Sequence, residues 1–250
     1  MHMKAAQRKR PSVRIGCAGG SVPAVHAGHF APGASALQRY ASRFSMVEIN
    51  SSFYRPHQAR TYERWASEVP ADFRFTVKFP QTVSHQAALR GTGPLLDGFF
   101  EAVHCLGDKL GALLLQLPPS LPYDGRVVAT FLRMVRGRSD RPLACEPRHP
   151  SWFTEKADEM LRVHGAARVV ADPARAANAG APGGVPEWTY WRLHGHPRVY
   201  YSRYSEEYLE KLALRVNTAA GHLHWVVFDN TAHGHAVGDA LRLRELLGGK

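Results

Sequence analysis

Short apolar segments recur roughly every thirty residues along the chain, and most of them end in polar or charged residues. Segments such as 113–117 and 169–171 are continuously apolar, as expected of strands that are covered on both faces. Between the segments, apolar residues recur at helical spacing. The alternation predicts parallel strands joined by helices, with strands near 14–19, 46–51, 74–80, 110–118, 142–148, 167–173, 190–195 and 224–230.

The helical stretches show the expected stripe, for example Leu37, Tyr40 and Phe44, and Ser205 before two glutamates is a predicted N-cap. Residues 173–187 are rich in Ala, Gly and Pro and have no helical period, so the sixth helix is expected to be missing or vestigial and replaced by a mobile loop. A chain of 250 residues with this alternation is typical of an α/β fold, a single (β/α)8 TIM barrel. We expect one domain over 13–250 and a disordered basic tail over 1–12.

Composition indicates an ordinary globular protein, with 44% hydrophobic and 21% charged residues. No apolar stretch reaches the length of a membrane span, and the basic N-terminus lacks the apolar core of a secretory signal. Three cysteines, Cys17, Cys105 and Cys145, are odd in number and lack metal-binding spacing. These features predict a cytoplasmic protein without a disulfide framework or membrane partner.

The net charge of +11 and a pI near 9.9 raise the possibility of nucleic-acid binding. The densest basic cluster of the predicted domain, Arg133, Arg136, Arg138 and Arg141, falls between a helix and the next strand. In a barrel this is the N-terminal face, opposite the active mouth. We therefore expect weak nucleic-acid binding through the basic tail, with a nucleic-acid-binding or endonuclease-like barrel as the alternative function.

Four of the strand ends carry polar residues spaced i, i+2, which point to the same side of a strand. The strand-end residues are Glu48/Asn50, Thr76/Lys78, Gln116, Glu146/Arg148, Asp172, Arg192/His194 and Asn230. Because parallel barrel strands end at one mouth, the sequence predicts that these side chains converge there.

Among the strand-end residues, Glu146 and His194 are the main general acid/base candidates, and Lys78 among other cations is a candidate base or imine-forming amine. Two arginines suggest a bound anion, because guanidinium groups hold carboxylate or phosphate with two hydrogen bonds. The predicted catalytic residues are Glu146, His194, Lys78, Glu48 and Asp172. The predicted substrate-binding residues are Asn50, Tyr54, His85, Gln116, Arg148, Arg192, Tyr204 and Asn230, of which Tyr54, His85 and Tyr204 come from loops and are expected to cover the ligand.

Two other readings of this set stay open. Three acids and three cations can neutralise one another as a salt-bridge network, and Glu146, Asp172 and His194 are possible ligands of a catalytic metal. Against a metal, Lys78, Arg148 and Arg192 would crowd a cation, so no metal ligand is predicted. The chain has no phosphate-binding glycine loop and no nucleophile elbow, so no cofactor is predicted either.

Several stretches resemble the DUF72 family, also called YecE-like proteins. They are Val47-Glu48-Ile49-Asn50-Ser51-Ser52-Phe53-Tyr54-Arg55, 73–78 with His85, 110–119, Glu146 with 148–149 and 151–153, 190–195, Tyr201 with 204–205, and 230–231. The resemblance covers about residues 13 to 247 and implies a TIM barrel of unestablished function.

The chain departs from the family pattern at Gly19-Gly20-Ser21, where a Gly-Trp is usual, at Pro147 and at Asp229. The missing aromatic side chain is expected to open one wall of the mouth. Taken together, the residues favour a metal-independent enzyme acting by acid/base chemistry on a small phosphorylated or carboxylated substrate. Whether it is an enzyme stays uncertain; lyase, isomerase and hydrolase reactions are all compatible, and a non-catalytic ligand sensor is a further alternative.

Overall fold

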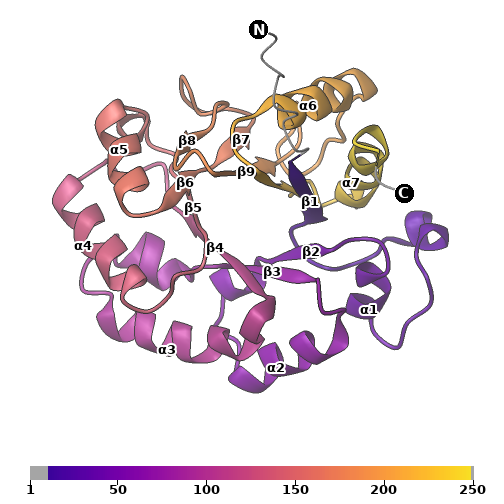
Figure 1. Ribbon diagram of the computed structural model, residues 1–250, viewed down its shortest axis with the longest axis horizontal. Coiled ribbons are helices and arrows are strands. Elements are labelled where there is room, and N and C mark those ends of the chain that lie inside the picture. Colours follow the sequence, from indigo (N-terminus) through magenta and orange to yellow (C-terminus); the bar gives the residue numbers. More distant parts are fainter. Residues whose placement is uncertain (1–10, 249–250) are drawn as a thin grey trace, which may run out of the picture.

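The computed structural model describes residues 11–248, and most of the predicted basic tail lies outside these residues. The first strand begins at Ser12, one residue before the predicted start of the barrel domain. Eight strand positions form one closed parallel barrel with helices around it (Figure 1). The strands are β1 (Ser12–Cys17), β2 (Met46–Ile49), β3 (Arg74–Lys78), β4 (Leu110–Gln116), β5 (Leu143–Glu146), β6 (Ala166–Arg168) continued by β7 (Val170–Asp172), β9 (Trp188–Leu193) and β10 (Leu223–Phe228).

Two runs of paired strands make the barrel, β2-β3-β4-β5-β6 and β7-β9-β10-β1. The first junction is the chain itself, because β6 passes into β7 through Val169, whose N–H donates to the Cys145 carbonyl at 2.8 Å. The second junction is the parallel bridge between Ala18 and Glu48, where the Gly19 N–H donates to the Glu48 carbonyl at 2.9 Å. All eight strands expected from the sequence are therefore present and closed into a ring.

The helices between strands follow the predicted apolar stripes. They are α1 (Ala36–Ala41), α2 (Ala59–Glu68), α3 (Gly93–Val103), α4 (Gly125–Arg136), α5 (Glu155–Val163), α6 (Glu206–Thr218) and α7 (His235–Leu246). The predicted N-cap of α6 is confirmed, because the Ser205 side chain accepts a hydrogen bond from the Tyr208 N–H. None of the helices in the described part of the chain is both long and apolar enough to cross a membrane.

The sixth helix is missing, as the sequence predicts. Within residues 173–187 the structure has no helix, only the two-residue strand β8 (Gly183–Gly184), which pairs antiparallel with β6. The Arg168 side chain is buried beneath this segment, where it donates to Asp158 Oδ1 at 2.7 Å and to the Asn178 carbonyl at 2.8 Å. A strap tied to β6 by backbone and side-chain hydrogen bonds thus replaces a helix on this side of the barrel.

Two apolar clusters divide the core and define which way each strand position faces. One fills the barrel and includes Met46, Leu114, Ala144, Val169 and Val227. The other lies between strands and helices and takes the alternate positions of the same strands. Since successive strand residues point to opposite faces, this alternation decides which polar residues at the strand ends enter the mouth.

The basic cluster of the N-terminal face is largely paired within the fold. Arg138 lies 2.6 Å from Asp97, and Arg141 lies 3.4 Å from Asp108. Arg136 at the end of α4 donates to the carbonyls of His164, Arg141 and Gly165. These arginines hold the helix-to-strand connections together, which reduces the basic surface they present.

Candidate functional site

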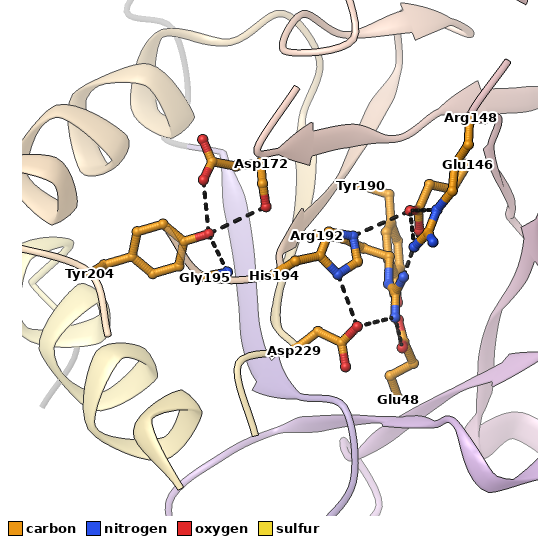
Figure 2. Close-up of polar contacts among 10 residues, drawn as sticks. All are labelled: Glu48, Glu146, Arg148, Asp172, Tyr190, Arg192, His194, Gly195, Tyr204 and Asp229. Atoms are coloured by element: carbon orange, nitrogen blue, oxygen red, sulfur yellow. Dashed lines mark hydrogen bonds and ion pairs between the residues drawn. The ribbon is translucent and has the colours of Figure 1, made fainter. Parts of the chain in front are cut away.

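Arg192 is the centre of a buried polar cluster at the C-terminal mouth of the barrel (Figure 2). Its side chain is fully buried and projects inward from the end of β9. Nε and Nη2 donate to the two oxygens of Glu48 at 3.1 and 2.7 Å, Nη1 donates to Glu146 at 2.5 Å, and Nη2 also donates to Asp229 at 3.0 Å. One guanidinium therefore joins carboxylates from β2, from β5 and from the residue after β10.

Glu48 is closed to a ligand by its own contacts. Its Oε2 accepts from Arg192 Nε and also from the Tyr190 hydroxyl at 2.9 Å, while Oε1 accepts from Arg192 Nη2. The carboxylate is fully buried. Glu48 and Arg192 thus form the base of the cluster, and neither is placed to contact a substrate directly.

Glu146 and Arg148 form the next layer outward. Arg148 donates from Nε and Nη2 to Glu146 Oε1 at 3.1 and 3.0 Å, so the i, i+2 pair of this strand end is an ion pair. Burial alone would raise the pKa of Glu146, but Arg192, His194 and Arg148 outweigh it and hold that pKa well below its usual value of 4.5. Glu146 is therefore a carboxylate at neutral pH and positions the groups around it.

His194 lies between two carboxylates, one on each ring nitrogen. Nδ1 lies 2.9 Å from Asp229 Oδ2, and Nε2 lies 3.2 Å from Glu146 Oε1. Burial disfavours the charged ring, yet the two carboxylates outweigh it and raise the pKa of His194 above its ordinary 6.5. An imidazole with an acceptor on each side carries two protons, so His194 is a proton donor held within the cluster.

Lys78 enters the mouth from β3 without an acceptor of its own. It is 5% exposed, and Nζ lies 4.1 Å above the centre of the Phe53 ring. Within residues 11–248, its amine makes no hydrogen bond or ion pair. Burial, followed by the charge of Arg192, lowers the pKa of Lys78 to about 8.

Four predicted binding residues lie around this cluster with differing access to it. Gln116 is opposite Glu146 in the β4–β5 register and faces the same side. The ring centres of His85 and Phe53 lie 4.9 Å apart with the rings nearly perpendicular, and burial together with Lys78 and Arg148 lowers the pKa of His85. Asn50 follows β2 with a buried Oδ1 that has no partner among the described residues. Tyr54 is 69% exposed, and its ring packs on Phe53.

Three predicted site residues face away from the cluster. Asp172 follows inward-facing Val169 by three positions, so it points to the helix side, where it accepts from the Tyr204 hydroxyl at 2.9 Å. Tyr204 is buried and also accepts from the Gly195 N–H at 2.8 Å. Asn230 is fully buried and donates to Ser202 O and Asp239 Oδ2. All three brace the loops of the mouth. Tyr204 does not cover the mouth as expected, because it lies with Asp172 and Gly195 away from the charged cluster (Figure 2).

Sequence reasoning missed three members of the site. Asp229 occupies the inward position that had been given to Asn230, and the alternation Trp225, Val227, Asp229 could have identified it. Tyr190 lies two residues before Arg192 and four before His194, so its side chain points to the same face of the strand. Tyr200 comes from the loop after β9, and no pattern in the sequence marks it.

Tyr200 lies beside both His194 and Arg148. Its ring centre is 5.7 Å from that of His194, edge to face. Against the effect of burial, Glu146 first and then Tyr200 raise the pKa of Arg148. The backbone of Tyr200 is left-handed, with φ of 70°, a conformation that is strained for a residue with a side chain. Strain of this kind is concentrated at functional sites, which supports a role for this tyrosine in the mouth.

Charges in the cluster nearly cancel. Arg192, Arg148, Lys78 and a protonated His194 carry four positive charges, and Glu48, Glu146 and Asp229 carry three negative ones, which leaves one positive charge. Each of the three carboxylates is bonded to Arg192. Among the described residues, no group of three His, Cys, Asp or Glu side chains is arranged to hold a metal ion.

A cavity of about 660 Å³ borders the segment Gly19-Gly20-Ser21. Val47, Ile49 and Trp65 also line it, which places it between β2 and the helix layer. The open space expected from the missing aromatic residue is therefore present beside the mouth, but on the helix side of β2. Asn50, with its unpartnered oxygen, lies at its edge.

Comparison with known proteins is consistent with this architecture. The chain is 33% identical over 156 residues to the UPF0759 protein YecE of Escherichia coli K12, covering 60% of this chain but only 56% of YecE. It is 28% identical over 246 residues to the UPF0759 protein YunF of Bacillus subtilis, covering 84% of this chain and 86% of YunF.

Solved structures show the same fold. A DUF72 family protein from Enterococcus faecalis V583 superposes with a TM-score of 0.82 at 21% identity, over 95% of this chain and 96% of the other. A DUF72 family protein from Thermotoga maritima MSB8 has a TM-score of 0.74 at 27% identity, over 95% and 99% of the two chains. The model of the family described as protein of unknown function DUF72 matches residues 14–250, and the chain therefore belongs to the DUF72 family.

Proposed function

We propose that the mouth of this barrel binds a small anionic substrate, phosphorylated or carboxylated, and acts on it by metal-independent acid/base chemistry. The observation that carries the proposal is the layering of charge. The carboxylates are bonded inside the cluster, whereas Lys78 and Arg148 occupy its outer side with hydrogen-bond donors that the carboxylates do not use up.

The anion is expected beside Arg148 and Lys78. Arg148 uses Nε and Nη2 on one oxygen of Glu146, and a guanidinium has five N–H donors in all, so donors remain for a ligand. His85 lies close enough for both cations to lower its pKa. Arg192 has no such freedom, because it is fully buried and its three nitrogens all donate to carboxylates. The sequence suggested ligand contacts from both arginines, and the proposed contact is now with Arg148 alone.

His194 is the proposed general acid. Its bond from Nε2 to Glu146 is the longer of its two contacts, 3.2 Å against 2.9 Å to Asp229. A substrate oxygen that replaced Glu146 at Nε2 would receive a proton while Asp229 continued to orient the ring. Before the substrate binds, Glu146 and Asp229 together keep the ring in its charged form, ready to donate a proton.

The decisive variant is Arg148→Ala, tested by calorimetric titration with inorganic phosphate. Loss of a charge-assisted hydrogen bond should weaken phosphate binding by about 1.5–3 kcal/mol. The fold should survive, because Glu146 keeps its bonds to Arg192 and His194.

The matched control is Arg138→Ala, which removes the same charge from the opposite face, where Arg138 pairs with Asp97. This variant should bind phosphate like the unaltered protein. Equal phosphate affinity of the Arg148→Ala protein and the unaltered protein, with both folded, would rule out the proposed site.

A further inference from the structure

Lys78 differs from the other lysines that the structure describes. Lys109 donates to the carbonyls of Ala66 and Val69, Lys211 pairs with Glu207, and Lys156 is exposed. Lys78 alone among these four is buried, and within the described part of the chain it has only an aromatic ring for a partner. Burying an amine without a hydrogen-bonded partner costs stability. A buried ionisable group of this kind in a cleft is a candidate for a functional role.

Charged groups from four strands or strand ends surround this amine. Arg192 of β9 opposes its protonation, while Glu48 of β2, Glu146 of β5 and Asp229 after β10 favour it. His85, from the turn after β3, feels the charge of Lys78 in return. None of the carboxylates forms an ion pair with Nζ, because Arg192 engages all three. The amine is thus near the acids without being neutralised by them.

A lysine nucleophile has to lose its proton near neutral pH. Burial, and then the positive charge of Arg192, lowers the pKa of Lys78 to about 8 from an ordinary 10.5. A substantial fraction of the amine is therefore uncharged at pH 7 to 8, which is the condition for attack on a carbonyl carbon.

We propose that Lys78 forms an imine with its substrate, so that the substrate is an aldehyde or ketone that also carries the anionic group. This inference rests on the proposed anion site, which would hold the carbonyl compound by its carboxylate or phosphate at Arg148. It narrows the substrate class from small anions in general to oxo acids and phosphorylated sugars or aldehydes.

The step is balanced without any further reactant. The uncharged Nζ attacks the carbonyl carbon, the nitrogen releases one of its two protons, and the carbonyl oxygen takes a proton to give a neutral carbinolamine. The hydroxyl then takes a second proton and leaves as water, while the nitrogen lone pair forms the C=N bond. Counted from the ammonium form, lysine and carbonyl give a protonated imine and one water molecule. The proposed donor of these protons is His194, which Asp229 and Glu146 hold in its protonated form.

Reductive trapping tests the inference on the intact protein. The unaltered chain is incubated with pyruvate and sodium borohydride, or separately with glyceraldehyde 3-phosphate, and digested for peptide mass spectrometry. One reduced adduct on Lys78 is expected, with Lys156 and Lys211 as internal controls for random modification. On the acid side of its pH profile the trapping rate should increase with pH, with a midpoint near the Lys78 pKa of about 8.

Two variants and one control test the imine. Lys78→Arg keeps the positive charge but removes the nucleophilic amine, so it should lose the adduct. His194→Gln should slow trapping by ~10²-fold, the lower end of what a general acid supplies. Lys211→Arg should trap at the unaltered rate. If Lys78→Arg misfolds, the peptide map of the unaltered chain still decides.

Each outcome has one meaning. Phosphate or pyruvate binding without an adduct on Lys78 would overturn the imine and leave the anion site standing. Absence of any binding to either ligand would overturn both proposals. An adduct spread evenly over the surface lysines would also refute a special role for Lys78.

Discussion

Single residues at the mouth show how closely strand parity controls the site. A shift of one position moves a side chain from the barrel interior to the helix side. Asp229 points inward and bonds Arg192 and His194, whereas its neighbour Asn230 points outward to Asp239. The two residues are adjacent in sequence but take part in different structures, one in the charged cluster and one in a loop support.

At the same scale, His194 should make stability depend on pH. Its pKa is raised in the folded protein, so its stabilising contribution is full below the unfolded value of about 6.5 and is lost as the pH rises through the folded value. Each pKa unit by which folding raises the value for His194 adds about 1.4 kcal/mol to the free energy of unfolding. The free energy of unfolding should therefore fall more steeply above pH 6.5 in the unaltered protein than in His194→Gln.

Denaturant unfolding at several pH values measures this difference. His222→Gln is the control, because His222 is exposed and its described hydrogen bonds are made by its backbone N–H and carbonyl groups. Parallel pH profiles for the unaltered protein and His194→Gln would show that His194 is not held charged by its two carboxylates. Lys78, whose pKa is lowered in the folded protein, makes the free energy of unfolding rise with pH instead. Because both proteins contain Lys78, subtracting one pH profile from the other removes most of this contribution.

Most of the site could be predicted from the residues, and the failures have a common physical cause. The i, i+2 pairs Glu146/Arg148 and Arg192/His194 converge as expected, because spacing within one strand is independent of its register. Asp172 was misplaced because apolar alternation is hidden where both strand faces are buried, so a continuous run such as 169–171 does not show which residue faces inward. Tyr200 could not be found, since loop conformation is set by tertiary contacts.

Among the elements, the strap of residues 173–187 is the most unusual, because it covers the barrel wall without a helix. Its fit depends on glycine. At Gly184 the backbone φ is +72°, and an added Cβ would lie 2.2 Å from the Ala166 carbonyl oxygen. The antiparallel pairing of β8 with β6 is possible only because no side chain occupies that position.

The variant Gly184→Ala should therefore be costly. We expect the free energy of unfolding to fall by about 1–3 kcal/mol from backbone strain and the clash with β6. Gly180→Ala in the same strap is the matched control, since its added Cβ would meet only the Ala174 methyl group at 3.6 Å. Thermal and denaturant unfolding measure both, and equal stability of the two variants would mean that the strap relaxes freely.

At the scale of the whole molecule, the excess positive charge of the chain is not concentrated at the mouth of the barrel. The net charge is +11, yet the arginines of the N-terminal face pair with Asp97 and Asp108 or with carbonyls. Residues 1–10, which make up most of the predicted basic tail, lie outside the described residues. We keep nucleic-acid binding as a separate proposal that concerns this tail.

The test is DNA binding at increasing salt concentration, with and without residues 1–10. Binding should be weak and unspecific, with a log–log slope of ~−0.9 for each phosphate contacted, and deletion of the tail should abolish most of it. Charge reversal at Arg133 and Arg138 is the control and should change it little. Tight binding that persists without the tail and is lost in Arg148→Ala would instead favour an endonuclease-like function of the mouth.

The bonds of Arg192 also bear on how the barrel assembles. Arg192 and Tyr190 reach Glu48 across 144 and 142 residues of sequence, and Arg192 reaches Asp229 from the strand before it. During synthesis Glu48 emerges long before Arg192, the cation that neutralises it. Contacts so distant in sequence form slowly, because a large loop must close first. The ring of strands and the charged mouth are then completed in one event, and a chain that has not yet added β10 has neither a closed barrel nor a formed site.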